Sequence, residues 1–299
     1  MSEQVVSARV IGAHGRHYDV ELPNGDVRRC YPKGKRNEAT VGDTVDITLD
    51  GDSEGYLFAI HPRKNLLYRS DEWRTKQFAA NVDRLFIVVA VEPTFSDDLL
   101  GRALTGAWAA DVEPVIVLNK VDLGDRVDQA RIRLAPYISL GVPMVELVAT
   151  DTAVVFDRLM PFMTGKTSLL LGQSAMGKST ILNALVPNAR ALTQEHSVAL
   201  GAGKHTTTTT RLYHLPNGAG DIIDSPGVQA FGLAHLSPED IERGFPEFVE
   251  HKRHCRFYNC SHQHEPGCGV LSALEKGLID TIRHQLYGRL LAEKASAKT

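Results

Sequence analysis

The chain has 299 residues, of which 43% are hydrophobic and 23% charged, and its formal net charge is −3. These values suit a globular protein of one to three domains, and the small net charge means that any nucleic-acid surface must be local. No stretch is apolar enough to span a membrane, and residues 1–10 lack the apolar segment of a secretion signal, so we expect a cytoplasmic protein that does not contact membranes.

Residues 1–62 are expected to be all-β. Short strand-like runs alternate there with turn signals such as Pro23-Asn24-Gly25-Asp26. Five short strands in about sixty residues are typical of a small barrel such as an OB-fold. The predicted strands are residues 5–11, 17–22, 26–31, 44–49 and 56–61.

A basic segment covers the third predicted strand and the loop that follows it. It holds five basic residues and a tyrosine, and no acid. One interpretation is an RNA-binding face on which the aromatic ring stacks with a base; the other is a solvated loop balanced by nearby acids. The sequence favours neither. The segment comprises Arg28, Arg29, Tyr31, Lys33, Lys35 and Arg36.

Residues 63–80 are polar and are expected to form a partly helical connector. From residue 81 to residue 235, apolar runs alternate with helical patterns, and the runs are nearly continuous, as in strands buried in a parallel sheet. This pattern predicts a doubly wound α/β sheet that binds ligands at the carboxyl ends of its strands. The expected strands are residues 85–91, 115–118, 144–148, 168–171, 211–215 and 221–223.

Asn119-Lys120-Val121-Asp122 directly follows one of these strands. The Asp122 carboxylate can accept hydrogen bonds from N1–H and the 2-amino group of guanine, whereas adenine has neither donor and would leave the carboxylate unpaired. The pattern is weak alone, but beside a phosphate-binding loop in the same sheet it predicts a guanine site. Ala149-Thr150, after the next strand, could donate a backbone N–H to the guanine carbonyl.

Gly172-x-x-x-x-Gly177-Lys178-Ser179 lies between an apolar strand and a helical pattern. This is the context of a P-loop, in which backbone N–H groups and a helix N-terminus hold phosphates; a chance match in a glycine-containing loop is the alternative. Lys178 would reach the β- and γ-phosphates, and Ser179 would bind Mg²⁺. The expected nucleotide contacts are Gly172, Gln173, Ser174, Ala175, Met176, Gly177, Lys178, Ser179 and Thr180.

Two segments further along could sense the γ-phosphate. Thr207, or its neighbour Thr206, could close on Mg²⁺ when GTP is bound and release after hydrolysis; a plain polar loop is the alternative. Asp224-Ser225-Pro226-Gly227 follows the last predicted strand, and here Asp224 would hold Mg²⁺ through water while the Gly227 N–H contacts the phosphate. An ordinary turn is the alternative for this second segment.

Residues 236–299 contain a cluster of cysteine and histidine and then a long predicted helical stretch over residues 271–294. Three of the four cysteines lie within fourteen residues, which favours a metal site over disulfides in a chain without a secretion signal. Cys255, Cys260, His262 and Cys268 offer three thiolates and an imidazole, a closed tetrahedral set for one structural Zn²⁺. Free buried thiols are the alternative, and the competing nitrogen ligands are His251, His254 and His264.

The order of these motifs is unusual. A conventional GTPase has its P-loop first, then the threonine switch, then Asp-x-x-Gly, and Asn-Lys-x-Asp last, whereas here Asn-Lys-x-Asp comes before the P-loop. With a preceding β-barrel, a His205-Thr206-Thr207-Thr208 segment and a trailing cysteine cluster, the whole chain resembles the RsgA (YjeQ) family of circularly permuted GTPases. The domains expected on this basis are residues 1–62, 63–235 and 236–299.

This resemblance implies an RNA-binding OB-fold, a permuted GTPase domain that binds Mg²⁺ with GTP, and a zinc-binding domain. It also implies GTP hydrolysis linked to late maturation of the small (30S) ribosomal subunit, with the subunit and its 16S rRNA as partners. We further expect stimulation of hydrolysis by the subunit, and a monomer.

The chain departs from the family pattern in two places. Ala175-Met176 replaces a usual Gly-Val in the P-loop, and Ala would be strained if this position needs a positive φ, so nucleotide affinity could be lower. Val228 stands where Ras-like proteins carry a water-orienting Gln, so unaided hydrolysis should be slow, on the order of 10⁻⁴ to 10⁻² s⁻¹. His205 is the candidate to orient water, unless it is an ordinary surface histidine.

These departures keep a rival function open. The chain could be an RNA-binding assembly module whose nucleotide pocket is vestigial, although Lys178, Asp122 and Asp224 argue against it. A P-loop ATPase or kinase fails to explain the Asn119-Lys120-x-Asp122 motif.

Overall fold

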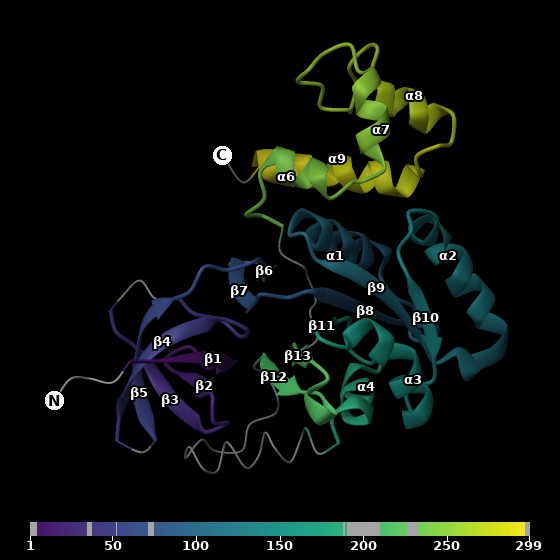
Figure 1. Cartoon of the computed structure of the whole chain (residues 1–299). Coiled ribbons are helices and arrows are strands. Elements are labelled where there is room, and N and C mark those ends of the chain that lie inside the picture. Colours follow the sequence, from purple (N-terminus) through teal and green to yellow (C-terminus); the bar gives the residue numbers. More distant parts are fainter. Residues whose placement is uncertain are drawn as a thin grey trace.

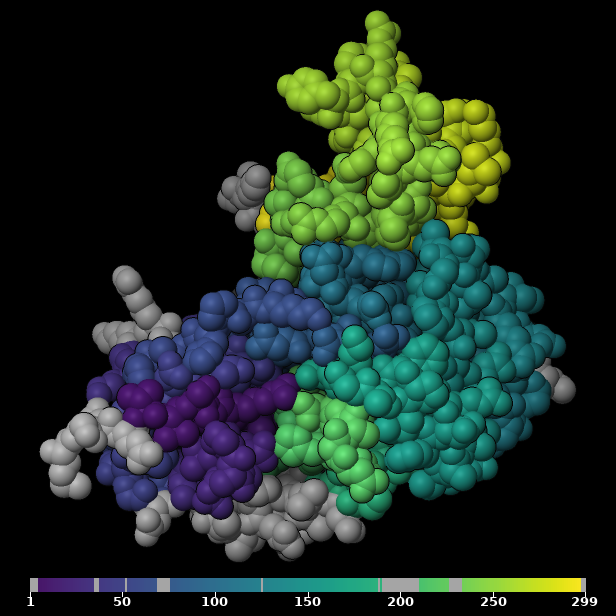
Figure 2. Space-filling model, in the orientation of Figure 1, coloured from purple at the N-terminus to yellow at the C-terminus, as the bar shows by residue number. Residues whose placement is uncertain are grey.

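The computed structural model describes residues 5–34, 38–51, 53–70, 75–187, 189, 210–225 and 233–296. Three bodies are visible along the chain: a strand barrel, a sheet covered by helices on both faces, and a helical C-terminal domain (Figure 1). Figure 2 shows the C-terminal domain projecting from the rest of the molecule, well away from the barrel. Within the described residues, no helix is both long enough and apolar enough to cross a membrane.

The N-terminal barrel follows the OB-fold prediction. Its strands pair in the order β1-β2-β3-β5-β4, and β4 pairs back onto β1, so the sheet closes on itself. Residues pointing inward, among them Val10, Val20, Ile47 and Leu57, have no exposed surface. The strands are β1 Val5–Ala13, β2 Tyr18–Glu21, β3 Val27–Pro32, β4 Thr44–Asp50 and β5 Glu54–Ile60.

Residues 63–80 were expected to be a partly helical connector, and this prediction is wrong. They contain an antiparallel hairpin of β6 Leu66–Ser70 and β7 Thr75–Ala80. Its apolar residues, such as Leu67 and Phe78, are buried against the main core. They are too few and too scattered among charged residues to give a strand period, so tertiary packing decides the structure here.

The central sheet has the predicted strands in the order β10-β9-β8-β11-β13-β12. The first five strands are parallel, whereas β12, which was grouped with the runs typical of buried parallel strands, is antiparallel to β13. The strands are β8 Arg84–Ala90, β9 Glu113–Asn119, β10 Met144–Leu147, β11 Thr167–Leu171, β12 Arg211–His214 and β13 Asp221–Asp224.

Helices cover both faces of this sheet (Figure 1). On one face lie α1 Asp97–Ala109 and α2 Val127–Ser139, and on the other α3 Thr152–Met163 and α4 Lys178–Leu185. Short 3₁₀ turns, η1 Val121–Arg126 and η2 Pro216–Gly218, follow β9 and β12. This is the doubly wound arrangement that places ligands at the carboxyl ends of the strands.

The barrel and the central sheet are joined through β12. It pairs antiparallel with β1 at Gly12 and Arg211, so the two bodies share one continuous sheet. His214 strengthens this junction, because its Nδ1 lies 2.7 Å from Asp221 and its Nε2 lies 2.7 Å from Glu21 on the barrel. A hydrogen bond to Asp221, and to a smaller extent one to Glu21, raises the pKa of His214 to about 10. The imidazole is therefore charged at neutral pH and bridges two carboxylates.

The C-terminal domain packs on α1 (Figure 1). Its helices are α6 Pro238–Arg243, α7 Phe248–His251, η3 Lys252–His254, α8 Gly269–Glu275 and α9 Thr281–Ser296. The single helix expected over residues 271–294 is therefore two helices, separated by Gly277, whose φ of +70° favours glycine. Arg283 of α9 is 1% exposed; it donates to Glu247 and to the Gly244 carbonyl and stacks over Phe245.

Candidate nucleotide site and metal centre

The predicted nucleotide motifs meet at one edge of the sheet. Asn119 ends β9, Ala149 follows β10, Gly172 follows β11 and Asp224 ends β13. These strands run parallel, so their carboxyl ends lie side by side. Segments separated by up to about a hundred residues in sequence therefore surround one space.

Two glycines of the P-loop are required by close contacts. A Cβ on Gly172 would lie 2.3 Å from the Val88 carbonyl oxygen, and a Cβ on Gly177 would lie 2.1 Å from Asn119 Nδ2. Neither position accepts a larger residue without moving its neighbour. Ala175 has a φ of +65°, which is the conformation that the sequence analysis identified as a source of strain.

Lys178 is held inside the loop. Its ammonium group donates to the carbonyl oxygens of Gly172 and Gln173, at 2.7 and 2.8 Å, and the residue is 8% exposed. Burial lowers the pKa of Lys178, and the nearby Asp224 carboxylate partly opposes that shift. A charged donor already desolvated at the mouth of the loop is suited to bind phosphate oxygens.

Asp224 carries the negative charge that lies near Lys178. Burial raises the pKa of its carboxyl to about 6, against the opposing effect of Lys178. A partly buried carboxylate with so little compensation is suited to bind a cation, and hard oxygen ligands are those that Mg²⁺ prefers. Ser179, in the first turn of α4, offers a hydroxyl beside the same loop. These donors fit Mg²⁺ bound together with a nucleotide.

Asn119 connects three of the motifs. It is 1% exposed, its Nδ2 donates to the Met176 carbonyl at 2.9 Å, and its Oδ1 accepts from the backbone N–H groups of Lys120 and Ala149 at 2.8 and 2.9 Å. The P-loop, the Asn-Lys-x-Asp turn and the Ala149-Thr150 segment are therefore positioned by one side chain. Asp122 lies at the start of η1 and is exposed, available to a base.

Several predicted residues lie outside the described part of the chain. They are His205, Thr206, Thr207 and Gly227 of the switch segments, with Val228, and Lys35 and Arg36 of the basic segment.

The four predicted zinc ligands converge. His262 Nδ1 lies 3.5 Å from Cys255 Sγ and 3.4 Å from Cys268 Sγ, and those two sulfurs are 3.9 Å apart; the ligand atoms of all four residues, Cys260 included, lie within 4.8 Å of one another. Tetrahedral zinc with sulfur ligands at about 2.3 Å separates them by about 3.8 Å, so the geometry fits. None of the four cysteines forms a disulfide.

One partner of this cluster has no signal in the sequence. Glu242 of α6 places Oε2 at 3.5 Å from His262 Nε2, the ring nitrogen that faces away from the sulfurs. A carboxylate in this position fixes the orientation of a metal-binding imidazole. Glu242 is twenty residues from His262 and gives no local signal. Of the candidate nitrogen ligands, the structure places His262 in the cluster rather than His251, His254 or His264.

The basic segment of the barrel carries a partly exposed tyrosine beside a more exposed one on the neighbouring strand. Tyr31 of β3 lies opposite Tyr56 of β5, with ring centroids 6.5 Å apart, and Tyr56 is 41% exposed. Arg28 and Arg29 are half-buried on the same strand, and Arg28 contacts Asp26. This surface is compatible with the RNA-binding interpretation and with the solvated one.

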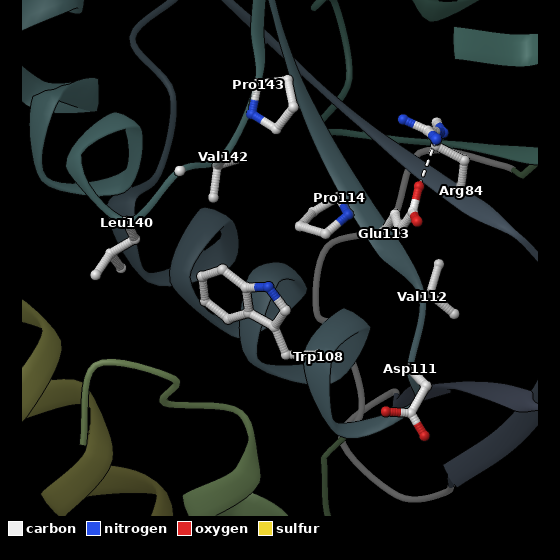
Figure 3. Close-up of a pocket in the computed structure, with 10 residues that line it drawn as sticks. Arg84, Trp108, Asp111, Val112, Glu113, Pro114, Leu140, Val142 and Pro143 are labelled. Atoms are coloured by element: carbon white, nitrogen blue, oxygen red, sulfur yellow. Dashed lines mark hydrogen bonds and ion pairs between the residues drawn. The ribbon is translucent and has the colours of Figure 1, made fainter. Parts of the chain in front are cut away.

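A hollow of about 420 Å³ lies at the opposite end of the sheet. Figure 3 shows Trp108, Pro114 and Pro143 around it, with Arg84 paired to Glu113 at one side. These residues adjoin the amino ends of β8, β9 and β10, and no predicted nucleotide contact is among the residues that line it. The hollow is therefore separate from the nucleotide site.

Comparison with known proteins agrees with this geometry. A family model described as RsgA GTPase matches residues 60–234. The small ribosomal subunit biogenesis GTPase RsgA of Bordetella pertussis is 63% identical over 298 residues, covering 100% of this chain and 99% of that protein. The protein of the same name from Ralstonia nicotianae is 50% identical, covering 97% of this chain and 92% of that protein.

The chain belongs to the RsgA GTPase family.

Solved structures extend the likeness to the whole fold. YjeQ from Thermotoga maritima superposes with a TM-score of 0.74 at 30% identity, covering 98% of this chain and 99% of that one. YloQ, described as a circularly permuted GTPase, gives 0.71 at 28% identity, covering 99% and 97%. The barrel, the permuted sheet and the C-terminal domain are thus those predicted. The protein is a GTP hydrolase that uses Mg²⁺ with GTP, which excludes the ATPase and kinase alternatives.

Proposed function

We propose that this GTPase acts in the cytoplasm on the small ribosomal subunit during its late maturation, contacts 16S rRNA, and hydrolyses GTP faster when the subunit is bound. The names of its relatives support the subunit as partner. The observation that supports the enzymatic part best is that the Asn119 side chain hydrogen-bonds three motifs, the P-loop, the Asn-Lys-x-Asp turn and the Ala149-Thr150 segment, which holds the proposed guanine and phosphate sites next to each other.

In this proposal the protein acts mainly by positioning the nucleotide, the metal ion and the attacking water. Asp122 binds the guanine edge, and because the Ala149 N–H already donates to Asn119, the Thr150 N–H is the donor to the guanine carbonyl. Lys178 leaves the loop carbonyls for the β- and γ-phosphates. Ser179 and Asp224 would hold Mg²⁺, which would supply positive charge against the phosphates. Water then attacks the γ-phosphorus, and the bond to the β-phosphate oxygen breaks.

The switch residues complete the proposal. Thr207 would close on the metal, the Gly227 N–H would contact the γ-phosphate and His205 would orient the water. Because Val228 cannot orient water, the bound subunit would supply or place the missing group, which gives the expected stimulation.

The other two domains would bind the subunit. One structural Zn²⁺ on Cys255, Cys260, His262 and Cys268 would hold the loop of the C-terminal domain, and the fit of their spacing to a tetrahedral site supports this. Arg28, Arg29, Tyr31 and Lys33, with Lys35 and Arg36, would contact RNA. We propose that the domains span residues 1–62, 63–235 and 236–299 and that the protein acts as a monomer.

The test is GTP hydrolysis at saturating GTP, with and without purified small subunits. Lys178→Ala serves as the blank, and Lys166→Ala is a matched control, because Lys166 belongs to a Gly-Lys-Thr at the other end of β11 and is exposed. We expect slow hydrolysis alone, strong stimulation by subunits, loss in Lys178→Ala and no change in Lys166→Ala. A rate that is above the blank and unchanged by subunits would refute the ribosomal coupling.

Membership of the RsgA GTPase family rules out the alternative of an RNA-binding assembly module with a vestigial pocket, so we expect hydrolysis above the blank even with the strained Ala175 in the loop.

A further inference from the structure

One other group of side chains in the described part of the chain has the spacing of a metal site. One nitrogen from each of His14 and His17 and one oxygen of Asp19 lie within 4.8 Å of one another. They lie where β1 turns into β2, next to β12, and far in sequence from the cysteine cluster. No motif of the nucleotide site includes them.

The hairpin brings these ligands together through its backbone. The His14 N–H donates to the His17 carbonyl at 3.0 Å, and the two imidazole rings stack with centroids 4.8 Å apart. Gly15, with a φ of +78°, allows the tight turn between them. Asp19 follows on β2, and its Oδ2 lies 3.1 Å from His14 Nε2, close to the separation of about 3.3 Å between two ligands on a tetrahedral ion.

Asp19 is the second observation that indicates a ligand. Its side chain is 3% exposed, and its Oδ1 is buried without a hydrogen-bond partner. Oδ2 contacts Arg211 Nη1 at 3.2 Å, while Arg211 Nη2 is also buried and unpartnered. Buried carboxylate oxygens are normally satisfied, so the Asp19 carboxylate has unused acceptor capacity at Oδ1, while its Oδ2 contacts His14 and Arg211.

We propose that His14, His17 and Asp19 bind a divalent transition-metal ion of the Zn²⁺ or Co²⁺ type at the junction of the barrel and the central sheet. Two histidines and one carboxylate are a common ligand set for such ions and leave coordination positions open for water or a phosphate oxygen. His14 and His17 are partly exposed, so the ion can enter from solvent.

The neighbourhood predicts a weaker site than the cysteine cluster. Arg211 already shares the Asp19 carboxylate, and its positive charge opposes a divalent ion at this distance. Bound metal would fix the hairpin tip and, through Asp19, the first residue of β12. This metal site consists of His14, His17 and Asp19 alone and does not depend on the function proposed above.

The test uses the full-length chain without a histidine tag, with Zn²⁺ already on its cysteine cluster. Co²⁺ is then titrated in and followed by absorption and calorimetry. We expect one further equivalent with the weak visible bands of Co²⁺ bound to nitrogen and oxygen, and without the near-ultraviolet charge-transfer band of a thiolate. His17→Ala, a change at a partly exposed side chain, should weaken this binding at least about tenfold.

His61→Ala is the matched control. His61 lies on the same barrel with Nε2 at 2.8 Å from Asp46 Oδ1, but it belongs to no group of three ligand atoms among the described residues. It should leave Co²⁺ binding unchanged. The proposal is overturned if no Co²⁺ binds in addition to the Zn²⁺, or if the thiolate band appears because Co²⁺ displaces Zn²⁺. It is also overturned if His17→Ala and His14→Ala both bind Co²⁺ like the wild type.

Discussion

Asn119→Ala gives the sharpest test of how the nucleotide site is held together. The change removes a side chain that is 1% exposed and makes hydrogen bonds to Met176, Lys120 and Ala149. No replacement partner is at hand in the alanine variant, so the Ala149 N–H and the Met176 carbonyl would be left buried without one. The P-loop and the guanine-binding segments would then be free to move relative to each other.

The magnitude follows from these contacts. A net hydrogen bond contributes about 1 kcal/mol and a stranded buried group costs about 1–3 kcal/mol, so the free energy of unfolding should fall by about 3 kcal/mol. About half of this is expected to appear in nucleotide binding, because the nucleotide must reorder loops that Asn119 otherwise holds. We therefore expect the Kd for GDP to rise about tenfold or more.

The assay is titration of fluorescent GDP together with urea unfolding, and the chain offers a matched control. Asn65 is another buried asparagine, 9% exposed, whose side chain donates to the Val82 carbonyl at 2.7 Å and accepts from the Val82 N–H at 2.9 Å. It lies at the β6–β7 hairpin, outside the nucleotide site. Asn65→Ala should lower stability by about 2 kcal/mol and leave GDP affinity within about twofold.

The comparison separates positioning from general loss of stability. If both variants weakened GDP binding equally, loss of stability alone would explain the effect. Wild-type affinity in Asn119→Ala would refute the argument that this side chain positions the site.

Three further predictions concern strain, pH and metal. Ala175→Gly should raise the free energy of unfolding by about 0.5–1 kcal/mol, because glycine adopts a φ of +65° without strain. The affinity for GDP should stay within about twofold, since the loop is already in this conformation. A loss of stability measured by calorimetry would contradict this prediction. The pKa of His214 is about 10 in the folded protein and ordinarily 6.5, so the stabilisation that its charge gives is complete below pH 6.5 and is lost as the pH rises to 10. Because the side chain is half exposed, we expect charged His214 to contribute only about 1 kcal/mol to the free energy of unfolding. Urea unfolding should show a stability difference between wild type and His214→Ala that shrinks from pH 7 to pH 10. A difference that stays constant would contradict the raised pKa of His214. Glu242→Gln should speed the transfer of Zn²⁺ to a chelator about 10–100-fold, whereas Glu239→Gln on the same helix should leave the rate unchanged. Equal transfer rates in the two variants would show that the Glu242 carboxylate does not help His262 to hold the metal.

Much of the nucleotide site could be predicted because its chemistry lies in contiguous segments. Strand, glycine loop and helix follow one another from Thr167 to Leu185, so the P-loop is recognisable without knowledge of any distant contact. The strain at Ala175 was predictable for the same reason, since the motif itself fixes which positions need a positive φ. The barrel followed from turn residues and strand spacing.

What the sequence could not supply depends on contacts between distant segments. The β6–β7 hairpin exists because Leu67 and Phe78 reach the main core, and Glu242 approaches His262 because α6 packs beside the cysteine loop. The direction of β12 follows from its pairing with β13 and β1, which a short apolar run does not encode. In each case the deciding partner is remote in the sequence.

The permuted chain order has a structural consequence that follows from these contacts. The segment of the proposed threonine switch leads directly into Arg211, which pairs with β1 of the barrel and contacts Asp19. The Asp224-Ser225-Pro226-Gly227 segment leads to Ser237, which caps α6 of the C-terminal domain. Each proposed switch is thus followed within about ten residues by an element that contacts a domain outside the nucleotide site. If both domains bind the subunit, any preference of the subunit for one switch conformation must appear equally as a preference for one nucleotide, because the coupling free energy is reciprocal.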